Sequence, residues 1–247
     1  MIVEGFSPAE SFGPEVAARY DDHPRGDETV AVEFLARYGG AGPALELAIG
    51  TGRIALPLAG RGIRVDGIDL SSSMVEKLRA KPGGDRLRVV IGDMAHVAVD
   101  GPYRIAYIVY NSIYNILDQD EQVEFFRNVA RQLSDDGVFV VEAAPPWAWA
   151  DARHREYARA EHVGAQSVRL DVVRYDPVTQ RFDENHVRLD RDGIRFDPIG
   201  ARLISPAEMD LMAKFAGLRL RERFGGWRGE PCTPDSVVHV SVYEHAH

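Results

Sequence analysis

The sequence predicts an α/β fold in which a seven-stranded, mostly parallel sheet carries helices on both faces and an antiparallel β insertion follows the fifth strand. Short apolar runs alternate with helical patterns over residues 41–143, which is typical of a parallel sheet. Three β-like runs then follow with no helical pattern between them. We therefore divide the chain into an N-terminal helical segment (1–40), a core (41–143), an insertion (144–204) and a C-terminal return to the sheet (205–247).

The elements of the first half follow from periodicity. Apolar residues at helical spacing predict helices over residues 12–20 and 29–38, ahead of the sheet. A second strand is predicted over 63–70, a helix over 72–79 that ends before Pro82, and a third strand over 87–91. Residues 105–110 form a near-continuous apolar run, as in the buried strands of parallel sheets.

The second half changes character after the fifth strand. A helix is predicted over 120–133 and a strand over 138–143. The insertion contains β-like runs at 167–175, 182–189 and 194–203, separated by turn sequences. Ser205 and Glu208 form a capping box that begins a helix, Gly217 ends this helix, and strands over 218–224 and 237–243 complete the sheet.

The segment Glu46-Leu47-Ala48-Ile49-Gly50-Thr51-Gly52-Arg53 is the most informative motif. Glycine permits a positive φ and a close approach of ligand to backbone, and the following helix directs its N-terminus at the same point. Gly50 to Ala55 also satisfies the relaxed dinucleotide pattern G-x-G-x-x-G/A, with Asp69 at about the expected 20 residues. Glu46 favours a cationic ligand, because a carboxylate at the strand end repels a pyrophosphate.

At this motif the chain resembles the class I S-adenosylmethionine-dependent methyltransferases, whose opening motif reads acid-x-Gly-x-Gly-x-Gly. Ala48 replaces the first glycine, and we expect it to have ordinary strand dihedral angles. The resemblance continues in order through Asp69, Asp93 and Asn111. It implies a Rossmann-like core that binds S-adenosylmethionine and transfers its methyl group. The resemblance implies cofactor contacts from Glu46, Ala48, Gly50, Gly52, Asp69, Leu70, Met74, Asp93, Met94 and Asn111, and a polar loop before the core adds Tyr20 and Arg25 as predicted contacts.

Each contact has an expected role in that resemblance. Asp69 would accept both ribose hydroxyls, and Asp93 would accept the adenine amine. The backbone amide of Met94 or Ala95 would donate to a ring nitrogen. Met74 would pack on the adenine or, alternatively, only in the core. Gly50 and Gly52 are expected at a turn too crowded for a β-carbon near the ligand, so that Gly52→Val would abolish binding but not folding.

The methionine end of the ligand has its own expected contacts. Glu46 would lie near it, and Asn111 would offer its carbonyl to the ligand ammonium. Tyr20 would approach the sulfonium and Arg25 the carboxylate from a polar loop that closes as a lid. The alternative is that Tyr20 ends an apolar stripe and Arg25 is solvated.

The acceptor chemistry is less constrained. Methyl transfer depends chiefly on alignment and exclusion of water, so a general base is optional, although a hydroxyl acceptor benefits from one. Tyr114, Asn115 and His154 are the predicted catalytic residues, and His186 is a further candidate by topology. The closing segment from Met209 is similar to bacterial small-molecule and peptide N-methyltransferases of secondary metabolism.

Composition excludes several other classes. The chain has 247 residues and a net charge of −9, and no cluster of basic and aromatic residues suggests nucleic acid as a partner. Cys232 is the only cysteine, which excludes an internal disulfide and a multi-thiolate metal site, and no metal is expected. No apolar run reaches the length of about 18 residues that a membrane span requires. We expect a cytoplasmic monomer or homodimer without membrane partners.

The sequence therefore predicts a methyltransferase that acts on a small-molecule acceptor, at nitrogen more readily than at oxygen. The acceptor class would be an amino sugar, an amino acid or a peptide-like molecule. Two other functions stay open besides O-methylation: an NAD-dependent oxidoreductase, which Glu46 and Asp93 disfavour, and a non-catalytic protein that only binds S-adenosylmethionine.

Overall fold

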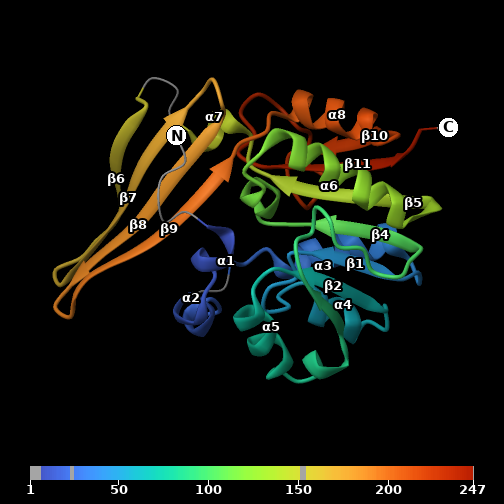
Figure 1. The fold of residues 1–247 in the computed structure, drawn as a ribbon, viewed down its shortest axis with the longest axis horizontal. Coiled ribbons are helices and arrows are strands. Elements are labelled where there is room, and N and C mark those ends of the chain that lie inside the picture. The colour runs from blue at the N-terminus through green and yellow to red at the C-terminus, as the bar shows by residue number, and fades with distance from the viewer. Residues whose placement is uncertain (1–6, 23–24, 151–153, 247) are drawn as a thin grey trace.

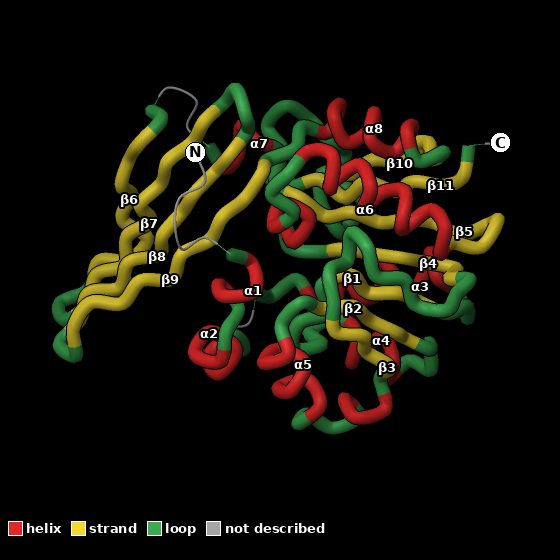
Figure 2. The backbone as a smooth tube through the Cα atoms, viewed as in Figure 1, coloured by secondary structure: helices red, strands yellow, loops and turns green. Residues whose placement is uncertain are grey.

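The computed structural model describes residues 7–22, 25–150 and 154–246, and two sheets organise them (Figures 1 and 2). The seven-stranded sheet has the order β10-β11-β5-β4-β1-β2-β3. Its strands are β1 (Ala44–Leu47), β2 (Val65–Asp69), β3 (Arg88–Ile91), β4 (Tyr103–Ile108), β5 (Leu133–Ala143), β10 (Leu218–Phe224) and β11 (His239–His245). Strands β1 to β5 pair in parallel, whereas β11 runs antiparallel to both of its neighbours. The carboxyl ends of β1 to β5 therefore meet at one edge of the sheet.

Helices cover both faces of this sheet, as the sequence predicts (Figure 1). One core cluster packs α6 (Gln119–Gln132) and α8 (Pro206–Phe215) on one face. The other packs α3 (Glu28–Gly39), α4 (Ala55–Gly60) and part of α5 (Ser72–Arg79) on the opposite face. Short 3-10 helices lie at η1 (Gly84–Arg86) and η2 (Ser112–Asn115), and α7 (Pro146–Trp149) follows β5.

The predicted helix over residues 12–20 is wrong in its bounds. The structure has two short helices, α1 (Pro8–Ser11) and α2 (Pro14–Arg19), with Gly13 as the N-cap of the second. Pro14 occupies the first turn of α2, where its missing N–H costs nothing, but it cannot continue a preceding helix. These two helices lie between the insertion and α5 (Figure 1).

The insertion is a second sheet of four antiparallel strands, one more than the sequence predicts. Its strands are β6 (Glu156–Val163), β7 (Ser167–Asp176), β8 (Arg181–Asp190) and β9 (Gly193–Arg202). The sequence does not predict β6, because its mostly exposed residues are rich in Ala, Glu and Arg and lack the β-branched alternation of the other three strands. At the inner end of this sheet, Tyr175, Phe182 and Ala201 belong to the core cluster that contains Phe139 and Val141 of β5. The rest of the sheet projects away from the seven-stranded sheet (Figure 2).

Candidate active site

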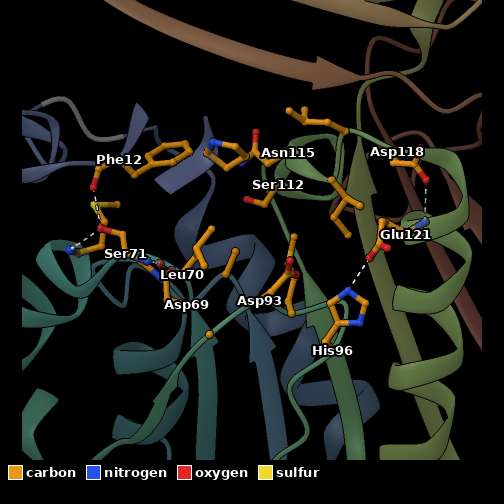
Figure 3. Close-up of a pocket in the computed structure, with 18 of the residues that line it drawn as sticks. Phe12, Asp69, Leu70, Ser71, Asp93, His96, Ser112, Asn115, Asp118 and Glu121 are labelled. Carbon is orange, nitrogen blue, oxygen red and sulfur yellow. Dashed lines mark hydrogen bonds and ion pairs between the residues drawn. The ribbon is translucent and has the colours of Figure 1, made fainter. Parts of the chain in front are cut away.

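A cavity of about 450 Å³ lies at the carboxyl edge of the parallel strands (Figure 3). The glycine turn after β1, the ends of β2 and β3, the η2 segment and the start of α6 form its walls, and α1 and α2 cover one side. Its lining residues are Pro8, Phe12, Tyr20, Ala48, Gly50, Asp69, Leu70, Ser71, Met74, Gly92, Asp93, Met94, His96, Ser112, Asn115, Ile116, Leu117, Asp118 and Glu121. Eight of the twelve predicted cofactor residues are among them: Tyr20, Ala48, Gly50, Asp69, Leu70, Met74, Asp93 and Met94.

The turn after β1 corrects two expectations. Ala48 has φ +59°, so it occupies the left-handed region and does not have the strand dihedral angles expected of it. Gly52 has φ +79°, and a β-carbon there would lie 2.2 Å from Leu78 Cδ1, in the core beneath the turn. Gly52 is therefore required for packing against α5, and it does not line the cavity. Gly50 does line it, and a β-carbon there would reach only Met74 Cε, at 3.4 Å.

Asp69 joins this turn to the end of β2. One carboxylate oxygen accepts the Gly50 amide at 2.6 Å, and the other accepts the Ser71 amide at 2.8 Å. Burial raises the pKa of Asp69, and these two amide bonds oppose the rise. The Ser71 hydroxyl caps α5 by accepting the Met74 amide, so the carboxylate is not itself needed as the helix cap.

The end of β3 presents a carboxylate, an amide and an imidazole to the cavity. Asp93 accepts the Ala95 amide at 2.8 Å, so of the two predicted amide donors only that of Met94 remains as a candidate for a ring nitrogen. His96 Nε2 lies 2.6 Å from Glu121 Oε2, which connects this loop to α6 (Figure 3). His96, Ser112, Asp118 and Glu121 also line the cavity, although no local sequence pattern predicts them, because only the pairing of strands brings their loops together.

Glu46 lies beneath the cavity and outside its lining. It is 2 % exposed, and the Tyr107 hydroxyl donates to its carboxylate at 3.0 Å. Burial raises the pKa of Glu46 to about 8, although Tyr107, Arg53 and the Ala55 amide oppose the rise. The side chain thus connects the end of β1 to the start of α4.

Asn111 connects β4 to β5. It has φ +60°, and its Oδ1 accepts the Ala144 amide at 2.6 Å. The neighbouring Tyr110 also has a positive φ, and its amide donates to Glu142 at 2.7 Å. Asn111 lies outside the cavity lining, so its predicted contact with the ligand ammonium stays a prediction.

The three predicted catalytic residues lie in different surroundings. Asn115 lines the cavity beside Ser112, both on η2 (Figure 3). Tyr114 points instead into the core, where its hydroxyl donates to the Ala144 and Ile204 carbonyls, and burial raises its pKa. This placement contradicts a catalytic Tyr114, because its hydroxyl is buried against backbone carbonyls and does not line the cavity. Residues three apart share one face of a 3-10 helix, so Ser112 and Asn115 line the cavity together. His154 is exposed directly before β6 and does not line the cavity.

The N-terminal helices lie against the cavity through several polar contacts. Asp21 accepts the Thr51 hydroxyl at 2.7 Å and pairs with Lys81 at 2.9 Å, and Ser71 Oγ donates to the Phe12 carbonyl at 2.6 Å. Phe12 and Tyr20 pack edge to face and both line the cavity.

Arg25 lies behind Tyr20, outside the lining. Its guanidinium lies 4.9 Å from the Tyr20 ring centroid and 3.2 Å from that of Tyr110.

Cys232 is exposed and unpaired, and within the described ranges no helix is long and apolar enough to cross a bilayer.

Comparisons with known proteins agree with this geometry. Residues 44–137 match the model of a methyltransferase domain family. The CcbJ methyltransferase from Streptomyces caelestis is 33 % identical, with a TM-score of 0.90 over 96 % of this chain and 98 % of that one. The cypemycin N-terminal methyltransferase from a Streptomyces species is 26 % identical over 81 % of this chain and 82 % of that protein.

A third comparison concerns the fold alone. The amino pentose methyltransferase CalS10 from Micromonospora echinaspora, solved with S-adenosylmethionine bound, is 20 % identical, with a TM-score of 0.67 over 94 % of this chain and 96 % of that one. The motif after β1, the fold and these similarities agree. The chain belongs to the class I S-adenosylmethionine-dependent methyltransferases of bacterial secondary metabolism.

Proposed function

We propose that this enzyme methylates a nitrogen atom of a small-molecule or peptide-like acceptor. The observation that carries the proposal is the state of the ionisable groups in the cavity lining. Asp69 and Asp93 accept backbone amides, Asp118 accepts the Asp120 and Glu121 amides as the cap of α6, and Glu121 pairs with His96. Every carboxylate and imidazole in the lining thus already has a partner.

This arrangement suits an amine better than a hydroxyl. A hydroxyl acceptor benefits from a base that removes its proton during attack, whereas an amine needs only to be neutral. In the proposed transfer, the amine lone pair forms the N–C bond as the C–S bond breaks, and the product ammonium later loses its proton to water. Ser112 and Asn115, which are neutral and polar, would orient the amine.

The relatives point in the same direction. One relative methylates an N-terminus, and one structural neighbour methylates an amino pentose, as their names state. We further propose that Asp69 holds the ribose hydroxyls, Asp93 and the Met94 amide hold the adenine, and Tyr20 and Arg25 belong to a lid over the methionine end. The chain would then consist of a lid (1–40), a core that binds the cofactor (41–143), an insertion that covers the acceptor site (144–204) and a segment that returns to the sheet (205–247).

The experiment pairs each amine with its hydroxyl analogue. Purified enzyme and S-adenosylmethionine are incubated with amino sugars, amino acids and short peptides and with the matching hydroxyl compounds, and methylated products are identified by mass spectrometry. We expect methylation of amines only, with a rate that rises with pH as the acceptor amine loses its proton. Methylation of the hydroxyl members alone would contradict the proposal.

Binding is measured separately from turnover. Asp69→Ala should weaken the binding of S-adenosylhomocysteine by about 1.5 to 3 kcal/mol, as measured by calorimetry, because the ribose hydroxyls lose a charged acceptor. Asp85→Ala, at an exposed position on η1, is the control and should bind as the wild type does. Tight binding of S-adenosylhomocysteine without turnover of any acceptor would favour a non-catalytic protein.

A further inference from the structure

A second pocket, of about 550 Å³, lies on the face of the seven-stranded sheet that α3 covers. The end of α3, the start of β4, parts of β5 and β10, and the loop after β10 form its walls. It shares no lining residue with the cofactor cavity. We call it the basic pocket, and its lining residues are Arg37, Tyr38, Arg104, Val138, Arg221, Glu222, Phe224, Arg228 and Gly229.

Positive charge dominates this lining. Four of its nine residues are arginines and one is an acid, whereas the whole chain has 29 basic and 38 acidic side chains. The arginines come from α3, β4, β10 and the loop after β10, so only the folded chain brings them together. Such a group of like charges creates a local field that attracts anions to a protein whose net charge is −9.

Two of the guanidinium groups have a carboxylate nearby. Arg104 pairs with Asp136 at 3.0 Å, although its buried Nη1 makes no well-aligned hydrogen bond. Arg221 lies 3.5 Å from Glu244, which pairs more closely with Arg219 at 2.6 Å. The charges of Arg104 and Arg221 are therefore only partly compensated.

The other two guanidinium groups have no carboxylate partner. Arg37 and Arg228 are exposed, and no acid within residues 7–22, 25–150 and 154–246 forms an ion pair with either of them. Glu222, the acid of the lining, accepts the Tyr38 hydroxyl. Glu230 contacts Arg228 through the backbone amide, at 3.0 Å. An anion in the pocket would thus meet two cations that are not already neutralised.

Aromatic rings position two of the arginines. The Arg37 guanidinium carbon lies 5.1 Å from the Phe34 ring centroid and 5.7 Å from that of Tyr38, and the Arg221 carbon also lies 5.7 Å from the Tyr38 centroid. A guanidinium group over a ring gains from the ring's charge distribution while the N–H groups at its edge remain able to donate. The pocket therefore holds its donors in place before a ligand binds.

The chemistry of these groups indicates the class of anion. A guanidinium group pairs with two oxygen atoms of a carboxylate or a phosphate. A single carboxylate carries one charge and engages one such group, whereas a diphosphate group carries at least two charges and oxygen atoms on two phosphorus atoms. The volume of the pocket also lies within the range of about 300–1,000 Å³ that is usual for small-molecule sites.

We propose that the basic pocket binds the diphosphate group of a small molecule, at a site separate from the one that transfers the methyl group. Arg37 and Arg228 would each pair with one phosphate, and Arg104 and Arg221 would add to the positive field. The group would come from inorganic diphosphate or from a nucleoside diphosphate. A nucleic acid is disfavoured, because the net charge of −9 repels a long phosphate backbone beyond the pocket.

Calorimetric titration of the full chain tests the proposal. Inorganic diphosphate and uridine diphosphate are titrated in the presence of saturating S-adenosylhomocysteine, which fills the cofactor cavity. We expect binding that weakens as the salt concentration rises. Arg37→Gln and Arg228→Gln should each weaken it about tenfold, and the double variant about 100-fold, because each change removes one charged pair. Equal affinities for the two probes would assign recognition to the diphosphate group alone, and tighter binding of uridine diphosphate would assign it to a nucleotide.

Arg86→Gln is the matched control. Arg86 is exposed on η1, directly before β3, and β3 and β10 are the two opposite edge strands of the sheet. This variant should bind both probes as the wild type does. Binding of S-adenosylhomocysteine by each variant verifies that it is folded. A wild type that binds neither probe overturns the proposal, and so does binding that the double variant retains in full.

Discussion

Residues at the turn after β1 separate the requirements of the ligand from those of the core. Gly50 and Gly52 both have positive φ, but only Gly50 lines the cavity. Ala48, also at a positive φ, shows that the turn tolerates one β-carbon in a strained backbone. The glycine pattern in the sequence thus combines two physical constraints that only the structure distinguishes.

The two glycines should respond differently to substitution. Gly52→Val should lower the free energy of unfolding by about 3 kcal/mol or more, because the new side chain overlaps Leu78 and Leu56 and requires an unfavourable φ. Gly50→Ala should cost only about 1 kcal/mol of stability and should reduce affinity for S-adenosylhomocysteine. Urea denaturation and calorimetry measure the two quantities. A stable Gly52→Val protein that fails only to bind ligand would restore the ligand-contact interpretation.

Glu46 predicts a specific pH dependence of stability. Because burial raises its folded-state pKa from 4.5 to about 8, the folded protein retains a proton that the unfolded chain releases. Stability from this group is therefore complete below pH 4.5 and is lost as the pH rises to about 8. The loss amounts to at most about 5 kcal/mol, from the difference between these two pKa values.

Urea denaturation at several pH values measures this loss. Glu46→Gln should remove most of the slope between these pH values, whereas Glu76→Gln, on the exposed side of α5, should retain it. An identical slope in Glu46→Gln and the wild type would show that Glu46 is ionised in the folded protein.

At the scale of elements, helices α1 and α2 are held to the core by polar contacts at their ends. Asp21 accepts the Thr51 hydroxyl in the glycine turn. It also pairs with Lys77, which lies on α5, and with Lys81, which follows this helix. These helices thus rest on the glycine turn and on α5, both of which contribute residues to the cavity lining. Its position depends on ion pairs and hydrogen bonds more than on burial, since Ala17 is the only fully buried residue of α2.

Loosening this attachment should weaken cofactor binding. Asp21→Ala should lower affinity for S-adenosylhomocysteine about fivefold, the value of one partly exposed charged contact. It should also speed proteolysis of the N-terminal segment, and we expect S-adenosylhomocysteine to slow this cleavage in the wild type. Asp22→Ala, at the adjacent exposed position, is the control. Deletion of residues 1–26 should reduce affinity and turnover together; if neither changes, the segment only packs.

At the scale of the whole molecule, a row of charged side chains crosses the insertion and ends at the lid. Arg159 pairs with Asp171 at 3.1 Å, and His186 Nδ1 lies 2.7 Å from Asp171. The next residue in register is Asp197, which pairs with Arg19 of α2. The Ser11 hydroxyl also donates to the Pro198 carbonyl at 2.7 Å. The insertion thereby contacts α1 and α2, the helices of the proposed lid, through β9.

This connection predicts an effect at a distance. Asp197→Asn should lower the affinity for S-adenosylhomocysteine about two- to threefold, as expected for the loss of a partly exposed ion pair, although Asp197 does not line the cavity. Asp192→Asn, in the exposed turn between β8 and β9, should have no effect. Equal affinities of the wild type and Asp197→Asn would show that the lid is positioned by the core alone.

The sequence by itself determined the alternation of strands and helices, the bounds of α5 and β10, and the place of Gly50, Asp69 and Asp93 at the carboxyl edge of the parallel strands. These depend on local periodicity, capping and turn chemistry, which are readable along the chain. Only the tertiary structure decided that Gly52 faces Leu78, that Tyr114 points into the core, and that His96 meets Glu121. Such contacts join residues that are far apart along the chain. Which of these residues meet depends on the order of the strands and on the direction of each side chain, and no local sequence pattern encodes either of these.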